Sequence, residues 1–112
     1  MPTRYRVTVV DEAKQDVQEI HDLIARDKKA AAAKWVREFH RQARSLSRLP
    51  HRYDPVSEAE DVHRPWRQII YGNYRIIYRI DENRVTVLRV IHAARLLSRG
   101  FFERLAKQSS KE

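Results

Sequence analysis

Cysteine is absent from the 112-residue sequence, which excludes a disulfide framework and thiolate chemistry. The N-terminus lacks the basic-then-apolar pattern of a signal peptide. No apolar run approaches the ~20 residues that span a bilayer. The five histidines show no paired ligand spacing, and we expect no metal site and no cofactor. These absences together predict a soluble, cytoplasmic protein with no membrane partner.

Acidic residues are scarce in the second half of the chain. Residues 1–63 hold 12 Lys/Arg and 11 Asp/Glu, whereas residues 64–112 hold 11 Lys/Arg and 4 Asp/Glu. Most of the formal net charge of +8 therefore belongs to the second half. A basic field of this kind favours an anionic partner, either nucleic acid or an acidic protein.

The length predicts one domain over residues 1–112, large enough for a hydrophobic core. Alternating apolar residues predict a strand over 4–10. Apolar residues every three or four positions then predict an amphipathic helix with Asp11 as its N-cap and an acidic outer face that includes Asp16. A second helix is expected from Ala30 to Leu49, where Pro50 stops it. Residues 50–65 are expected to form a loop.

Residues 66–95 predict a meander of three strands. Gly72 and Asn73 are typical of a two-residue hairpin turn, and residues 81–83 predict a second turn. A short terminal helix is expected over 98–107. The order predicts an α+β fold, in which a helix pair packs on a mainly antiparallel four-stranded sheet.

Alternation along these strands predicts how their side chains are divided between two faces. Arg75 and Arg79 share a face with Ile77, while Tyr74, Ile76, Tyr78 and Ile80 form the better core face. On the last strand, Thr86, Leu88, Val90 and His92 form the cleaner core face. Arg75, Arg79 and Arg89 are then expected to form an exposed basic surface. Trp66, at the start of a strand, is expected to be available to a partner. Trp35, Phe39 and the meander tyrosines are expected to pack the core.

Two segments carry a resemblance to a known family. Residues 74–80 read Tyr-Arg-Ile-Ile-Tyr-Arg-Ile, and residues 87–95 read Val-Leu-Arg-Val-Ile-His-Ala-Ala-Arg. Together with the helix pair, they resemble the RelE/ParE superfamily of bacterial type II toxins, closer to the ParE branch. The resemblance implies a growth-arresting toxin that inhibits DNA gyrase and forms a hetero-oligomer with an acidic, ParD-like antitoxin.

The RelE branch offers a second function, a metal-independent mRNA endonuclease that acts on the ribosome. In that branch, the resemblance implies roles for Arg67 and Arg95 at the scissile phosphate, with His92 as the proton-transfer group. Phe101 stands at about the position of the RelE catalytic tyrosine, and phenylalanine has no proton to give. The second strand also lacks the lysines of RelE-like enzymes. Both departures favour a ParE-like toxin with no catalytic site of its own.

A third function also stays open, an inactive family member that only binds an antitoxin. The antitoxin is expected to cover the basic surface of the sheet and the groove beside the helix pair. The residues expected to contact the antitoxin or the target are Arg67, Arg75, Arg79, Arg89, Arg95 and Trp66.

Overall fold

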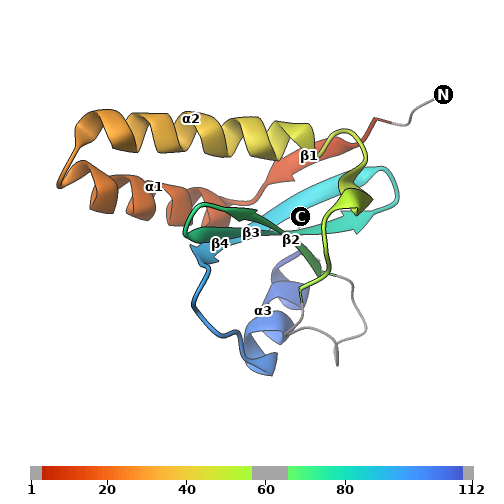
Figure 1. Ribbon diagram of the computed structural model, residues 1–112. Helices are drawn as coiled ribbons and strands as arrows, with labels where there is room; N and C mark the ends of the chain where they lie inside the picture. Colours follow the sequence, from red (N-terminus) through yellow and green to blue (C-terminus); the bar gives the residue numbers. More distant parts are fainter. Residues whose placement is uncertain (1–3, 57–65, 110–112) are drawn as a thin grey trace.

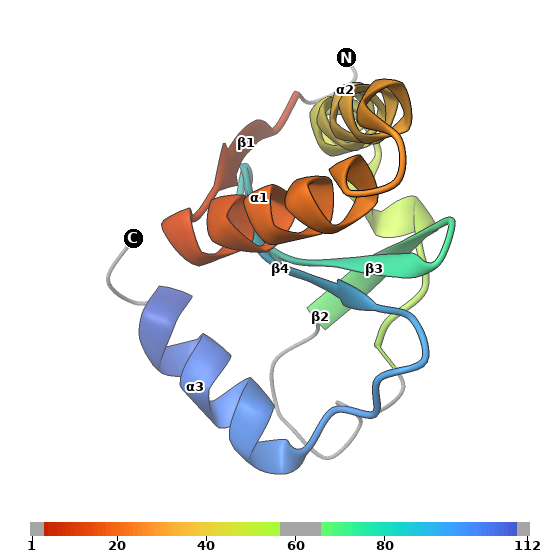
Figure 2. The same ribbon diagram turned by 90° about the vertical axis from the view of Figure 1, so that its left-hand side faces the viewer.

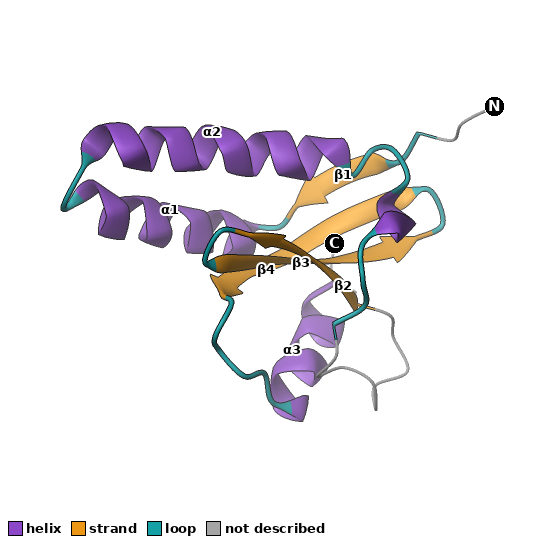
Figure 3. Ribbon diagram, in the orientation of Figure 1, coloured by secondary structure: helices purple, strands orange, loops and turns teal. Residues whose placement is uncertain are grey.

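The computed structural model describes residues 4–56 and 66–109. Its elements are β1 (Arg6–Val9), α1 (Asp11–Ala25), α2 (Lys29–Ser45), the 3-10 helix η1 (Pro50–Arg52), β2 (Trp66–Tyr71), β3 (Tyr74–Asp81), β4 (Arg84–His92) and α3 (Arg99–Ser109). The predicted α+β class and the predicted strand and helix order are confirmed (Figure 3). Within the described residues, every helix is too short or too polar to cross a membrane.

The four strands form one sheet in the order β1-β4-β3-β2. β1 runs parallel to β4, and the other two pairings are antiparallel, so the sheet is mainly antiparallel as predicted. Gly72 and Asn73 form the predicted turn between β2 and β3, and Gly72 has the positive φ of 57° that glycine adopts without steric penalty. A register shift interrupts the β3–β4 pairing, where Ile77 and Tyr78 face Arg89 and Val87 and leave Leu88 between them.

Both predicted helix limits that relied on a single residue are wrong. The N-cap of α1 is Val10, without a side-chain capping bond, and Asp11 is the first helical residue, where its charge suits the helix dipole. α2 ends at Ser45, four residues before Leu49. Because proline disfavours helical backbone in the residue before it, Pro50 acts upstream of its own position. Leu49 instead adopts left-handed backbone, with φ of 48°.

The helix pair covers one face of the sheet. α1 and α2 lie side by side on this face, and α3 lies on the opposite face (Figures 1 and 2). The ring of Trp35 on α2 stacks on Phe39 and Tyr71 and meets the edge of Tyr74. The hydroxyl of Tyr78, from the same face, donates to the carbonyl of Pro50 at 2.5 Å. The expected packing role of these aromatic residues is confirmed.

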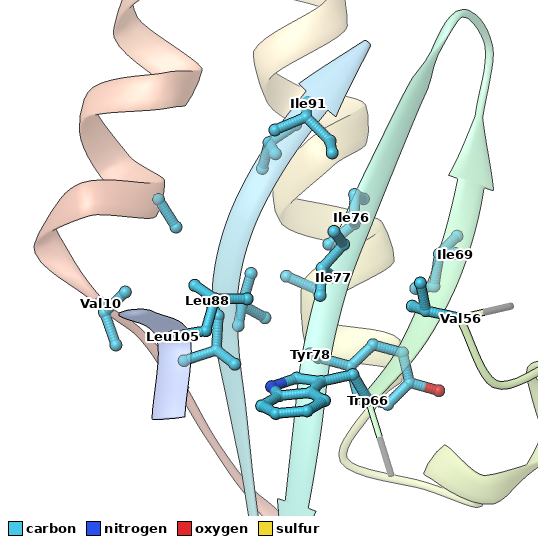
Figure 4. Packing of buried hydrophobic residues seen from close by; sticks show 14 of the residues in the cluster. Val10, Val56, Trp66, Ile69, Ile76, Ile77, Tyr78, Leu88, Ile91 and Leu105 are labelled. Atoms are coloured by element: carbon cyan, nitrogen blue, oxygen red, sulfur yellow. The ribbon is translucent and has the colours of Figure 1, made fainter. Parts of the chain in front are cut away.

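The opposite face is closed by α3. Phe102 is fully buried with its ring 5.2 Å from that of Trp66 on β2. Leu105 of α3 and Leu88 of β4 are buried in the same cluster (Figure 4). The sheet therefore has a helical layer on each side, and both of its faces contribute to the core.

Candidate functional site: a covered arginine face and an open groove

The expected basic surface of the sheet is not exposed. Arg75 and Arg79 are 5% and 9% exposed, and Arg89 is half-buried. The predicted division of β3 into two faces is consistent with the pairing, but the arginine face lies under α3 and the segment before it. Trp66, expected to be available to a partner, is fully buried. The predicted exposures of these four side chains were wrong because the pattern of residues along a strand contains no information about what covers each face of the sheet.

Arg89 is held by a carboxylate from α1. Its Nε lies 2.7 Å from Oδ2 of Asp16, and its Nη2 lies 3.1 Å from Oδ1. The hydrogen bond to Asp16 raises the pKa of Arg89, against the opposing effect of burial. Oδ2 of Asp16 also accepts from the backbone N–H of Val90 at 2.9 Å. The carboxylate therefore takes the place of a strand partner just beyond the end of β1.

Two guanidinium groups lie over the ring of Phe101. The Cζ atoms of Arg89 and Arg95 are 5.5 and 5.8 Å from the ring centre, within the range of a cation–π contact. Phe101 is 3% exposed, whereas Arg95 is exposed as expected. The position that resembles a catalytic tyrosine is thus a packed ring beneath two cations.

Arg67 and Arg95 are not brought together. Arg75 donates to the side chain of Gln68 and to the backbone carbonyl of Arg95, which places these groups on the α3 face. Arg67 neighbours Gln68 on β2 and therefore points to the other face. There its Nη1 donates to the carbonyl of Tyr53 at 2.7 Å. An arrangement of both guanidinium groups around one phosphate is not present in the structure.

His92 ends β4 with its ring exposed, although alternation had assigned it to the core face. Its Nδ1 accepts from the backbone N–H of Ala94 at 3.1 Å, and its ring meets the edge of Tyr74. This acceptor role leaves the proton of a neutral ring on Nε2. His63, Arg64 and the acidic residues Glu58, Glu60 and Asp61 lie outside the described residues. No cluster that suits a metal ion occurs in the described part of the chain.

An open groove runs between α1, α2 and the end of β1. It has a volume of about 590 Å³ and is lined by the buried or half-buried side chains of Val9, Val17 and Val36. Lys14 and Arg37 are exposed and contribute positive charge to its lining. None of the described residues that line the groove is acidic. The groove suits an apolar segment that carries negative charge.

The matching family model is that of the ParE toxin of the type II toxin–antitoxin system parDE, over residues 7–97. This range includes α1, α2 and all four strands except the first residue of β1. The chain belongs to the ParE toxin family. No curated protein matches the sequence.

Solved structures that share the fold of this ParE-family chain include two toxin–antitoxin systems. One, the chromosomal ParDE system from P. aeruginosa, has a TM-score of 0.66 at 15% identity, covering 80% of this chain and 97% of that chain. The other, the toxin–antitoxin complex RelBE2 from Mycobacterium tuberculosis, has a TM-score of 0.52 at 28% identity, covering 83% and 95%. The expected membership of the RelE/ParE superfamily is therefore confirmed.

Sequence reasoning missed the role of Asp16 in this ParE-family chain. Asp16 was assigned to the acidic outer face of the first helix, with Glu12, Glu19 and Asp22. The arginine at 89, alone among apolar residues near the end of a strand, was the available signal that a buried carboxylate was needed. The sequence contained no comparable signal of which carboxylate would meet it.

Proposed function

We propose that this chain is a ParE-like toxin that inhibits DNA gyrase and arrests growth until an antitoxin neutralises it. The observation that carries the proposal is Phe101, buried where a RelE-like enzyme would need a proton-transfer group. The match to the ParE toxin family over residues 7–97 supports the same branch. Inhibition then depends on protein contacts and requires neither a metal nor a cofactor.

A RelE-like endonuclease is the second possibility, because a RelBE complex is among the similar structures. The separation of Arg67 from Arg95 by the sheet argues against it. Among the residues expected at a target surface, Arg95 is exposed and is also held in place by neighbouring side chains. Its backbone carbonyl is held by Arg75 and its guanidinium lies over Phe101.

The experiment is a pair of assays with purified protein. A gyrase supercoiling reaction and a programmed ribosome with mRNA each receive the same concentrations of the chain. We expect supercoiling to be inhibited and the mRNA to remain intact. Codon-positioned cleavage that is lost in Arg95→Ala would support the endonuclease instead. No effect in both assays, without growth arrest, would support an inactive antitoxin-binding module.

The antitoxin is proposed to occupy the groove between α1 and α2 and to form a hetero-oligomer with the toxin. Its expected chemistry is an acidic segment with apolar residues on one side, matching the lining of Val17, Val36 and Arg37. Such a segment can be disordered when free and fold when it binds. Arg75, Arg79 and Trp66 then contribute as buried supports rather than as direct contacts.

Charge reversal in the groove tests this docking site. Arg37→Glu is expected to weaken the complex with the cognate antitoxin about tenfold, roughly 1.4 kcal/mol. Arg44→Glu makes the same change at an exposed position of α2 outside the groove and serves as the control. Isothermal titration of both variants gives the affinities. Equal affinities for the two variants would place the antitoxin elsewhere.

A further inference from the structure

The segment after α2 holds an exposed leucine in strained backbone. Leu49 has φ of 48° and ψ of 52°, in the left-handed region. This region is unfavourable for a residue with a Cβ, and the following proline disfavours helical backbone still further. Leu49 is nevertheless 72% exposed, so burial of its side chain does not offset the strain.

Side-chain donors hold this segment in place through its carbonyl groups. The buried hydroxyl of Tyr78 donates to Pro50, and Arg67 donates to His51 and Tyr53. The guanidinium of Arg52 donates to Leu49 at 3.2 Å. Three side chains, two of them from neighbouring strands of the sheet, thus form hydrogen bonds with the backbone of residues 49–53.

A hollow of about 410 Å³ lies beside the leucine. It is lined by Tyr5, Leu49, Pro50, His51 and Arg52. The ring of Tyr5 meets that of His51 edge-on at 6.2 Å, so the lining is largely aromatic and apolar. The groove between α1 and α2 is lined by none of these residues, and the two sites are therefore distinct.

One arginine lines the hollow, and two more stand next to lining residues in the sequence. The first is Arg52, and the other two are Arg4 and Arg48; all three are exposed. Neither Arg4 nor Arg48 forms an ion pair within the described residues. An acidic protein surface complements this charge. An exposed leucine beside an apolar hollow favours a protein partner over a nucleic acid, because phosphate groups are bound by charged and polar donors and not by aliphatic side chains.

We infer that Leu49 and its hollow form the contact through which this chain binds the protein whose loss of function arrests growth. The partner presents an apolar side chain, flanked by carboxylates, to the hollow. The tethered segment is organised before binding, which reduces the entropy lost on association. The inference rests on the proposed toxin activity, but it does not depend on gyrase being the target.

In the test, residues 1–112 are expressed in a bacterial host, growth is measured, and the thermal unfolding of each purified variant is recorded. Leu49→Gly removes the anchor and relieves the strain, so growth arrest should be lost while the melting temperature is equal to or above that of the wild type. Leu49→Ala removes the anchor and keeps the strain, and it should also lose growth arrest. Leu23→Ala, a matched truncation of an exposed leucine on α1, should arrest growth like the wild type.

Growth arrest that survives in Leu49→Ala and Leu49→Gly would overturn the inference. Loss of arrest in Arg48→Glu with retention in Leu49→Ala would also overturn it, since charge alone would then recruit a nucleic acid. A wild-type chain that arrests no growth contradicts it as well. Arrest by the wild type without gyrase inhibition would contradict the proposed target only, and the Leu49 variants would still decide this inference.

Discussion

The two faces of the sheet are closed in different ways. Beneath the helix pair, Trp35 packs against Phe39, Tyr71 and Tyr74, so this face is closed largely by contacts between rings. Beneath α3, phenylalanine and leucine side chains share the surface with arginines that need specific partners. A row of cations on a strand therefore does not establish an exposed surface.

The arginine face depends on a few pairings of charged groups, whereas the aromatic face depends mostly on packed rings and on hydrogen bonds from tyrosine hydroxyl groups. Asp16 reaches Arg89 from a helix 73 residues earlier in the chain. Because Asp16 neutralises the charge of Arg89, α3 can place the apolar ring of Phe101 against this arginine. Charge on this face is therefore internal to the fold, and the net positive charge of the second half overstates the exposed positive charge.

The largest effect is expected from removing a ring on the α3 face. Phe102→Ala should lower the free energy of unfolding by about 4 kcal/mol, because it leaves a cavity beside the buried ring of Trp66. Phe39→Ala makes the same truncation under the helix pair and should have a similar effect. Urea unfolding gives both values. A loss below about 1 kcal/mol for Phe102→Ala would mean that α3 is not part of the core.

Breaking the pair between α1 and β4 should have the next largest effect. Asp16→Ala leaves Arg89 and the N–H of Val90 without their acceptor, and we expect a loss of about 3 kcal/mol. The double variant Asp16→Ala/Arg89→Met also removes the guanidinium group that the single variant leaves unpaired, and it should recover part of the lost free energy of unfolding. If the changes in the free energy of unfolding of Asp16→Ala and of Arg89→Met, measured by urea unfolding, add up to that of the double variant, Asp16 and Arg89 are not coupled.

The hydrogen bond from Tyr78 to Pro50, the residue after Leu49, should contribute less to the free energy of unfolding. Tyr78→Phe removes the hydroxyl that donates to Pro50 and should lower the free energy of unfolding by about 1–2 kcal/mol. Tyr71→Phe removes a longer hydrogen bond, 3.2 Å, from a half-buried hydroxyl and should cost less. Thermal unfolding of the two variants ranks them. The reverse order would argue that the tether does not stabilise the segment.

The same hydroxyl should also make the stability depend on alkaline pH. Burial raises the pKa of Tyr78 from 10.0 to about 12. The unfolded chain therefore loses this proton first, and the stability contributed by Tyr78 is complete below pH 10 and declines as the pH rises toward 12. The difference in stability between wild type and Tyr78→Phe should narrow between pH 9 and pH 11.5. A constant difference in urea unfolding over this range would contradict the assigned environment.

Several features of the fold were predictable from local patterns. The turn at Gly72 and the β3 alternation of Arg75 with Tyr74 follow from backbone preferences and the period of two. Leu88 shows where that reasoning fails. The register shift on β4 interrupts strict alternation at Leu88, which lies in the buried cluster that also contains Leu105 of α3. His92 pairs with Tyr74 but is exposed at the end of the strand.

The sequence by itself determined the order of helices and strands, the superfamily and the missing proton-transfer tyrosine at Phe101. These follow from local spacing, turn chemistry and residue identity. Only the tertiary structure decided that Arg89 meets Asp16, that α3 covers the arginines, and that Leu49 is exposed in strained backbone. The physical reason is that exposure depends on contacts between segments far apart in the chain, which no local pattern encodes.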